Sequence, residues 1–158
     1  MKIANVIHQV NLTENVAIVS FEKAPVKISF VSALFDYVAK AGINVDMISQ
    51  TTPKGDSNTI SFTVSDDKVA DMLALITSLN NDKRAVMPLI SAGNVKIALY
   101  GPEMPNLVGV ASDVFDRLNE VGVDVLLITT SDVDISIVVS RANAELAYQT
   151  LREAYLGK

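Results

Sequence analysis

The sequence has no cysteine and no tryptophan, and it has one histidine among 158 residues. The missing cysteine excludes disulfides and thiolate metal ligands, and it leaves the redox compartment undetermined. A single histidine excludes a metal cluster built from imidazoles. The glycine-rich loops and the GxxxxGK[ST] pattern that hold nucleotide phosphates are missing too. We therefore expect no metal and no cofactor.

Basic runs and long apolar runs are also missing. Lysine and arginine number 13 against 18 aspartates and glutamates, for a formal net charge of −5, which argues against nucleic acid as a partner. No stretch approaches the roughly twenty apolar residues that a membrane span needs, and the N-terminus lacks the apolar region of a signal peptide. We expect a soluble, cytoplasmic protein that binds neither nucleic acid nor membrane.

What the sequence does contain is an internal repeat. The stretch GINVDMISQT at residues 42–51 returns eighty residues later as GVDVLLITTS at residues 122–131. Upstream, apolar positions match at the same offset, among them Val31/Ala111, Leu34/Val114, Phe35/Phe115 and Val38/Leu118. A repeat of this length indicates one module used twice. Because each half would be marginally stable alone, we expect the halves to pack on one another.

Hydrophobic periodicity predicts the elements of each copy. Val31, Leu34, Phe35 and Val38 recur at the spacing of one helix face. In the first copy we expect strands at 3–8 and 15–21 around a polar turn at 11–15, a helix at 28–41, strands at 43–51 and 59–64, a helix at 65–79 and a strand at 84–90. In the second copy we expect a strand at 95–100, a helix at 107–121, strands at 123–130 and 133–139, and a helix at 141–155.

This order of elements predicts an α+β fold of two ferredoxin-like βαββαβ units lying side by side. Two strands are left over, at residues 3–8 and 84–90, one for each copy. Pro88 favours an edge position for the second of these strands.

The sequence offers few side chains in arrangements that would support catalysis. His8 has no serine or acid at a useful spacing and is interpreted as structural, and the paired acids Asp66 and Asp67 as helix-start charges. An acylphosphatase-like enzyme would need an arginine in the first loop, which offers only Lys23 and Lys27. RNA-binding sheets of the same topology carry exposed aromatics on their central strands, and this sequence does not. The sequence indicates no enzyme, and the RNA-binding alternative is weak.

Backbone geometry offers a binding site instead. The loops at 23–29 and 101–109 each lead into a long helix, whose free N–H groups and positive dipole favour a carboxylate. Asn44 and Asp124 place a polar side chain at the start of the following strand. A free amino acid would supply a carboxylate to the first element and an ammonium group to the second. The alternative, that both polar residues merely begin strands, stays open.

Several stretches resemble a known family. Residues 42–50, 59–64, 109–111 and 127–138 look like the tandem ACT domains at the C-terminus of aspartokinases, and the match spans nearly the whole chain. The resemblance implies a chain that is not an enzyme on its own but the regulatory part of an aspartate kinase, whose catalytic domain would be a partner. Such ACT pairs bind lysine or threonine between ACT units and give feedback control of the aspartate pathway.

The resemblance also implies domain bounds and an assembly. The first ACT unit, residues 14–90, would be inserted after the N-terminal strand of the second, residues 3–8 plus 93–156. A homodimer formed through ACT units is expected. The alternative function is a degenerate ACT pair that serves as a dimerisation or interaction module without a ligand.

The effector contacts implied by the resemblance fall in both copies. In the first copy they are Lys27, Ile28, Ser29, Val31, Asn44, Val45 and Gln50. In the second copy they are Gly109, Asp124, Val125, Ser131 and Asp132. The sequence departs from the family where Asp-x-Pro-Gly of the first loop is replaced by residues 26–29, VKIS, and where the second-copy asparagine is replaced by Asp124.

Overall fold

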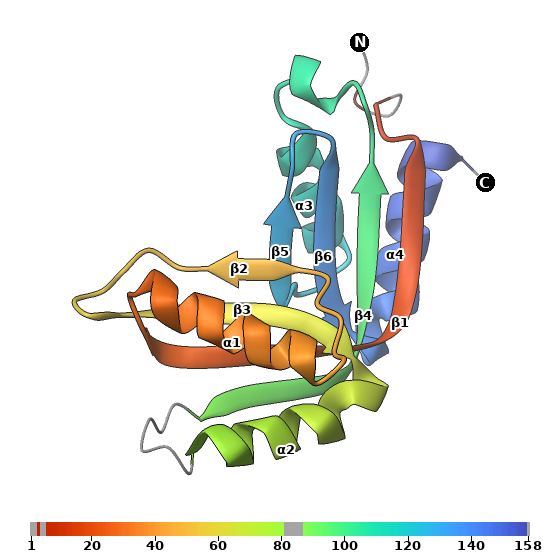
Figure 1. The fold of residues 1–158 in the computed structure, drawn as a ribbon. Coiled ribbons are helices and arrows are strands. Elements are labelled where there is room, and N and C mark those ends of the chain that lie inside the picture. The colour runs from red at the N-terminus through yellow and green to blue at the C-terminus, as the bar shows by residue number, and fades with distance from the viewer. Residues whose placement is uncertain (1–2, 4–5, 81–86, 158) are drawn as a thin grey trace. The chain divides into compact units, whose positions relative to one another are not determined.

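The computed structural model describes residues 3, 6–80 and 87–157 (Figure 1). The chain forms two compact units: Asn15–Ala92, here called the inserted unit, and Met1–Glu14 with Gly93–Lys158, here called the split unit. Strands β1 (Gln9–Pro25) and β4 (Pro88–Tyr100) are long enough to contribute residues to both. Each unit is described by itself below.

The inserted unit has the strand order β2-β3-β1-β4. Strand β3 (Ser57–Ser65) pairs antiparallel with both β1 and β2 (Ile48–Gln50). Helices α1 (Ile28–Lys40) and α2 (Val69–Asn80), the latter after a 3-10 turn at Asp66–Lys68, complete the unit. The core centres on Phe62, whose ring lies 6.2 Å from that of Phe21 and 5.3 Å from that of Phe35.

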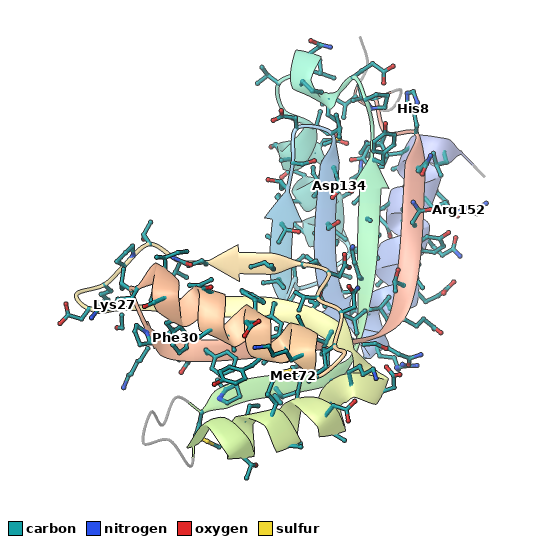
Figure 2. All side chains as sticks on the ribbon, in the orientation of Figure 1. His8, Lys27, Phe30, Met72, Asp134 and Arg152 are labelled. Carbon is teal, nitrogen blue, oxygen red and sulfur yellow. The ribbon has the colours of Figure 1, made fainter. Side chains whose placement is uncertain are left out.

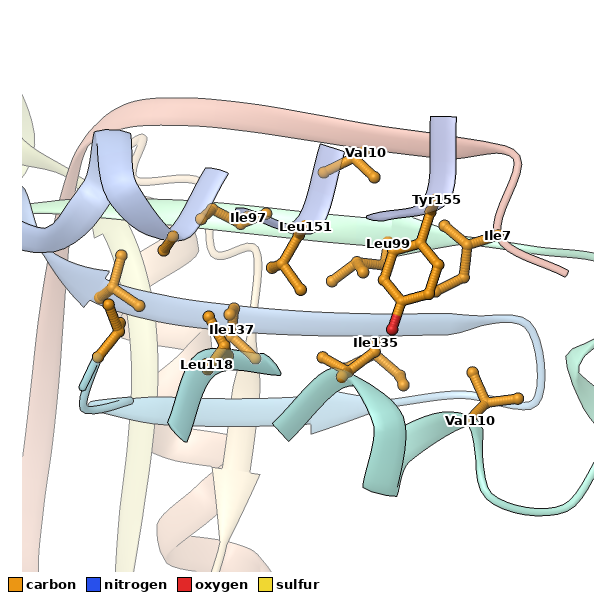
Figure 3. Packing of buried hydrophobic residues seen from close by; sticks show 14 of the residues in the cluster. Ile7, Val10, Ile97, Leu99, Val110, Leu118, Ile135, Ile137, Leu151 and Tyr155 are labelled. Carbon is orange, nitrogen blue, oxygen red and sulfur yellow. The ribbon is translucent and has the colours of Figure 1, made fainter. Parts of the chain in front are cut away.

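The split unit has the strand order β1-β4-β6-β5, with β5 at Leu127–Thr130 and β6 at Asp134–Ser140. Its helices are α3 (Val110–Glu120) and α4 (Arg141–Leu156), and a 3-10 turn spans Met104–Asn106. Figure 3 shows apolar side chains of the sheet facing those of both helices. The packed residues that it labels on these elements include Ile97, Leu99, Ile137, Leu118 and Leu151, all buried.

The α+β prediction of two ferredoxin-like units is therefore confirmed, because each unit carries two helices and four neighbouring strands in the order typical of that fold. The ends of the predicted helices agree with the structure to within about four residues. No helix among the described residues is long and apolar enough to cross a membrane.

The prediction of a strand at 3–8 was wrong. Strand β1 begins at Gln9 and continues through the predicted turn at 11–15. Asn15 adopts a left-handed φ of 58° within the strand, so the polar cluster marks a local irregularity rather than a chain reversal. Residues 4 and 5 of the predicted strand lie outside the described residues.

The predicted strands at 84–90 and 95–100 form the single strand β4, with Pro88 as its first residue. This is a position where the missing proline N–H is tolerated. Gly93, with a φ of 73°, lies between the two predicted segments. Residues 84–86 lie outside the described part of the chain.

The strands that follow the first helix of each unit are shorter than predicted. Strand β2 begins only at Ile48. The segment before it is held by Thr63 through both backbone and side chain: the Thr63 carbonyl accepts the Asp46 N–H at 3.1 Å, and the Thr63 hydroxyl accepts the Met47 N–H at 2.9 Å. Strand β5 likewise begins at Leu127 rather than 123. Helix α3 begins at Val110 rather than 107.

Candidate functional site

A pocket of about 160 Å³ lies in the inserted unit where β1 leads into α1, and we call it the helix-start pocket. Three segments line it: the link between β1 and α1 with the first turn of the helix, the end of β2, and the start of β3. The lining residues are Pro25, Val26, Lys27, Ile28, Val31, Gln50 and Asn58. Figure 2 labels Lys27 and Phe30 at the N-terminal end of α1.

Backbone hydrogen bonds fix the short link that forms one wall. Pro25 ends β1 opposite Ser57 of β3. The Val26 N–H donates to the Asp56 carbonyl at 3.3 Å, and the Lys27 N–H donates to the Pro25 carbonyl at 2.8 Å. The chain therefore passes from strand to helix in two residues, and the first turn of α1 is held beside the β2–β3 hairpin.

The start of α1 leaves backbone donors available. The N–H groups of Phe30 and Val31 both approach the Lys27 carbonyl, at 2.9 and 3.4 Å. Within the described chain no hydrogen bond is recorded for the N–H groups of Ile28 and Ser29. Lys27 makes no side-chain cap, and the first turn contains no acidic residue. This helix end therefore keeps its positive dipole and its free donors, which favour a bound anion.

Asn58 supplies the complementary group. It lies in β3 opposite Ala24 and is only 5% exposed. Its Oδ1 atom is buried and has no hydrogen-bond partner among the described residues. A buried acceptor left unpaired costs about 1–3 kcal/mol, so such an atom in a pocket lining requires an explanation. A ligand N–H or O–H would satisfy it.

The structure brings together four of the seven first-copy residues expected at the effector site: Lys27, Ile28, Val31 and Gln50 line the helix-start pocket. Ser29 is exposed on the first turn of α1 but is not among the lining residues. Asn44 is exposed in the segment before β2, and Val45 packs against the core of the unit. Neither residue lines the pocket.

The five second-copy residues lie on three segments of the split unit. Gly109 precedes α3 with a left-handed φ of 97°. Asp124 is exposed before β5, whereas Val125 packs against the core. Ser131 and Asp132 occupy the β5–β6 turn, where the Ser131 N–H donates to the Asp134 carbonyl at 2.9 Å and the Ser131 hydroxyl accepts the Val133 N–H at 3.3 Å.

Pro25 and Val26 lie in the loop at 23–29 that the sequence indicated, although neither was named as a contact, and sequence reasoning missed Asn58. Asn58 lies between the strands predicted at 43–51 and 59–64, in a position where a turn is expected and asparagine is ordinary. The repeat carried a usable signal. The hairpin of the second copy is five residues shorter, so Ile60 and Ser61 correspond to Ile135 and Ser136 rather than to positions eighty residues on. By the same alignment Asn58 corresponds to Val133 in the second copy. A polar residue in one copy at a position that is apolar in the other marks a site of divergence.

A second polar cluster joins the two helices of the split unit. The Tyr155 hydroxyl donates to Asp113 at 2.6 Å, Arg117 Nε donates to the same carboxylate at 2.8 Å, and the guanidinium lies 5.2 Å from the Tyr155 ring centre. Burial opposes ionisation of Asp113, but the hydrogen bonds from Arg117 and Tyr155 outweigh it and hold the pKa of Asp113 below its ordinary value. Burial, followed by the bond to Asp113, raises the pKa of Tyr155.

This cluster ties α4 to α3 and every charge in it is paired, so we interpret it as structural. His8 also has a partner, since its Nε2 lies 3.0 Å from Glu103 Oε2. Among the described residues there is no group of three or more metal-ligating side chains that could hold an ion. Among the described residues, the helix-start pocket combines a cavity with free backbone donors and an unpaired buried acceptor, so we take it as the candidate site.

Comparisons with known proteins show what the chain is similar to. Residues 97–155 match the family model described as ACT domain. An aspartokinase of Helicobacter pylori is 27% identical over 158 residues, covering 95% of this chain and 36% of that protein. An aspartokinase of Geobacillus stearothermophilus is 26% identical over 140 residues, covering 89% of this chain and 33% of that protein. The chain thus spans about a third of the length of these curated relatives.

Solved structures extend the similarity over the whole chain. The regulatory subunit of aspartate kinase from Thermus thermophilus, in its ligand-free form, has a TM-score of 0.85 at 22% identity, over 96% of this chain and 99% of that one. A structure of aspartokinase alpha and beta subunits has a TM-score of 0.83 at 26% identity, over 95% and 99%. Aspartate kinase from Synechocystis has a TM-score of 0.90 at 28% identity, over 98% of this chain and 28% of that one.

The predicted resemblance to the tandem ACT regulatory region of aspartokinases is confirmed. The chain matches nearly all of the aspartokinase regulatory-subunit structure and only about a third of the complete kinases. It is therefore similar to the small regulatory part of these enzymes.

Proposed function

We propose that this chain, which is similar to aspartokinase regulatory regions, senses an amino acid through the helix-start pocket and gives feedback control of an aspartate kinase. The effector is an end product of the aspartate pathway, lysine or threonine. Residues 14–90 and residues 3–8 plus 93–156 act as its two ACT units, and its partners are an aspartokinase catalytic domain and a second copy of the chain.

The observation that carries this proposal is the unpaired Oδ1 of Asn58 beside the start of α1. A free amino acid is a zwitterion. Its carboxylate suits the free N–H groups of the first helical turn, and its ammonium group offers the donor that Asn58 needs. Gln50, also in the lining, adds an amide that can donate or accept. Each half of the ligand thus meets the complementary half of the pocket.

A thermal-shift panel with the twenty amino acids tests the proposal. A ligand that binds only the native state stabilises it by about 2.7 kcal/mol at one hundred times its dissociation constant. We expect a dose-dependent rise of the melting temperature with at least one effector. A flat response across the panel would refute amino-acid sensing by this chain.

Variants localise the response. Asn58→Val copies the residue that the second unit carries at this position, so it should fold and lose the ligand-induced shift. Ser131→Ala, in the split unit, is the matched control and should keep the shift. An Asn58→Val variant that responds like the natural chain would place the effector elsewhere.

Control of catalysis requires a second site, because allostery is a coupling free energy between two sites. Adding the effector to the chain assembled with a kinase catalytic domain should lower kinase activity. If the effector changes the affinity of the kinase for its ligand by some factor, that ligand should change the affinity for the effector by the same factor. Light scattering of the isolated chain should give twice the mass of one protomer. A monomer at every concentration would contradict the proposed homodimer.

Two observations favour a second candidate function, an ACT pair retained for association without a ligand. The first loop lacks the aspartate and the glycine of the family pattern, and Ile48 on edge strand β2 is 53% exposed. Exposed edges with apolar side chains are suited to pairing with another chain. A dimer that responds to no amino acid would support this function.

A further inference from the structure

We propose that the helix-start pocket selects its ligand by charge: it prefers amino acids with neutral or acidic side chains over those with cationic ones, and Lys27 is the specificity-determining residue. The inference rests on the proposed function, which makes this pocket an amino-acid site. It narrows the effector class, because it favours threonine over lysine.

The charges in the pocket lining all have one sign. Among the described residues of the lining, Lys27 alone has a charged side chain, and none is an aspartate or glutamate. The positive end of the α1 dipole lies at the same place and is not offset by an acidic residue in the first turn. Asp56 and Lys54 belong to the neighbouring hairpin, but both are exposed and neither lines the pocket.

Apart from Lys27, the polar side chains of the described lining are neutral amides, which suit one ammonium group but include no carboxylate to balance the charge of a second. The Oδ1 of Asn58 is an unpaired, neutral, buried acceptor, and it matches the α-ammonium that every amino acid carries. A second ammonium on the side chain would find no carboxylate among the described lining residues and would lose hydration beside Lys27. An acidic side chain would instead be attracted to Lys27 and to the helix end.

The expected selectivity is moderate, because Lys27 is exposed and water screens exposed charges. A helix dipole and one nearby charge at a partly solvated site account for a discrimination of about three- to tenfold. Salt should reduce it, since charged groups at the surface are screened over about 10 Å at 0.1 M ionic strength.

Three probes of matched length test the inference with the full chain: homoserine, aspartate and 2,4-diaminobutyrate, whose side chains are neutral, anionic and cationic. We expect calorimetric or thermal-shift titrations to give dissociation constants about three- to tenfold lower for homoserine and aspartate than for 2,4-diaminobutyrate. This difference in dissociation constant should become smaller when the sodium chloride concentration is raised.

Variants assign the effect to Lys27. Lys27→Gln should reduce the difference in dissociation constant between 2,4-diaminobutyrate and the other two probes. Lys27→Glu should reverse that difference, so that 2,4-diaminobutyrate binds more tightly. Folding should tolerate Lys27→Glu, because the side chain is exposed and an acid at a helix start is favourable. Lys54→Gln removes a charge in the hairpin beyond the lining and should leave the ranking unchanged.

The outcomes separate the two proposals. Equal binding of homoserine and 2,4-diaminobutyrate by the natural chain, or a ranking unmoved by Lys27→Glu, would overturn charge selection and leave amino-acid sensing intact. No response to these probes or to any of the twenty amino acids would overturn both.

Discussion

The two units each have their own core, with apolar residues at matching positions, and they differ where β1 leads into α1 and β4 leads into α3. The paired positions Leu34/Val114 and Val38/Leu118 are buried in both. In the inserted unit, strand and helix are joined by only two residues, beside Asn58. In the split unit, the joining segment is 101–109, and its Met104 is buried in the core cluster. Duplication kept the packing and changed the helix start, a place where backbone donors are free to bind a ligand.

This comparison predicts that substitution of Gly101, the first residue of the longer link, destabilises the split unit. A Cβ added at Gly101 would lie 2.0 Å from the Val6 carbonyl oxygen, which is backbone and cannot move aside cheaply. We expect Gly101→Ala to lower the free energy of unfolding by about 3 kcal/mol, as overpacking does when the backbone must shift. Chemical denaturation would measure the loss.

Gly55 in the inserted unit is the matched control. It has a φ of 64°, but a Cβ there would meet no atom within 4 Å. Gly55→Ala should therefore cost only the left-handed strain, about 1–2 kcal/mol. A cost for Gly101→Ala no larger than that for Gly55→Ala would show that the Val6 segment adapts freely and that the links are equally tolerant.

The split unit also differs in its charged cluster between helices, which Tyr155→Phe would break. Losing the hydroxyl donor to Asp113 should destabilise the protein by about 1.5 kcal/mol, the low end for a hydrogen bond to a charged group. At the eighty-residue offset of the repeat, Asp113 corresponds to Ala33. The inserted unit therefore has no carboxylate at this position, and the cluster is a feature of the split unit.

The pH dependence of this loss follows from the pKa shifts. Because the pKa of folded Asp113 is lowered, its contribution is present above the ordinary value near 4 and is lost as pH falls through the folded pKa. Because the pKa of folded Tyr155 is raised, its contribution is present below about 10 and is lost as pH rises through the folded pKa. The difference between natural chain and variant should be flat from about pH 5 to 9 and shrink outside that range. A difference that grew in acid would contradict the assigned bonds.

The sequence was sufficient for the fold because the repeat and the helical spacing report packing directly. Leu34 and Val38 are buried on α1 as their period indicates, and each copy placed its two helices correctly. Strand ends were less predictable. Asn15 ended a predicted turn and Gly93 lay between two predicted strands, but both residues adopt a left-handed φ inside continuous strands. Local sequence signals a backbone conformation, and only tertiary pairing decides whether the chain reverses there.

The candidate site was predictable only where the family pattern and the backbone agreed. The family resemblance implied Lys27, Ile28, Val31 and Gln50 by position, and these residues line the pocket. Asn58 was missed, because whether an asparagine near a turn is exposed or buried without a partner depends on the chain packed over it. Comparing the two copies position by position would have identified it.

The smallest predicted effect returns to that position. Asn58 and Val133 correspond in the repeat, and the unpaired Oδ1 costs the inserted unit stability that valine would not lose. Without ligand, Asn58→Val should raise the free energy of unfolding by up to about 1 kcal/mol, measured by denaturant titration. With ligand bound, the natural chain should have the larger free energy of unfolding, because only asparagine can accept a hydrogen bond from the ligand. A ligand-free variant less stable than the natural chain would mean that Asn58 serves the fold, and the difference between the units at this position would then concern structure rather than sensing.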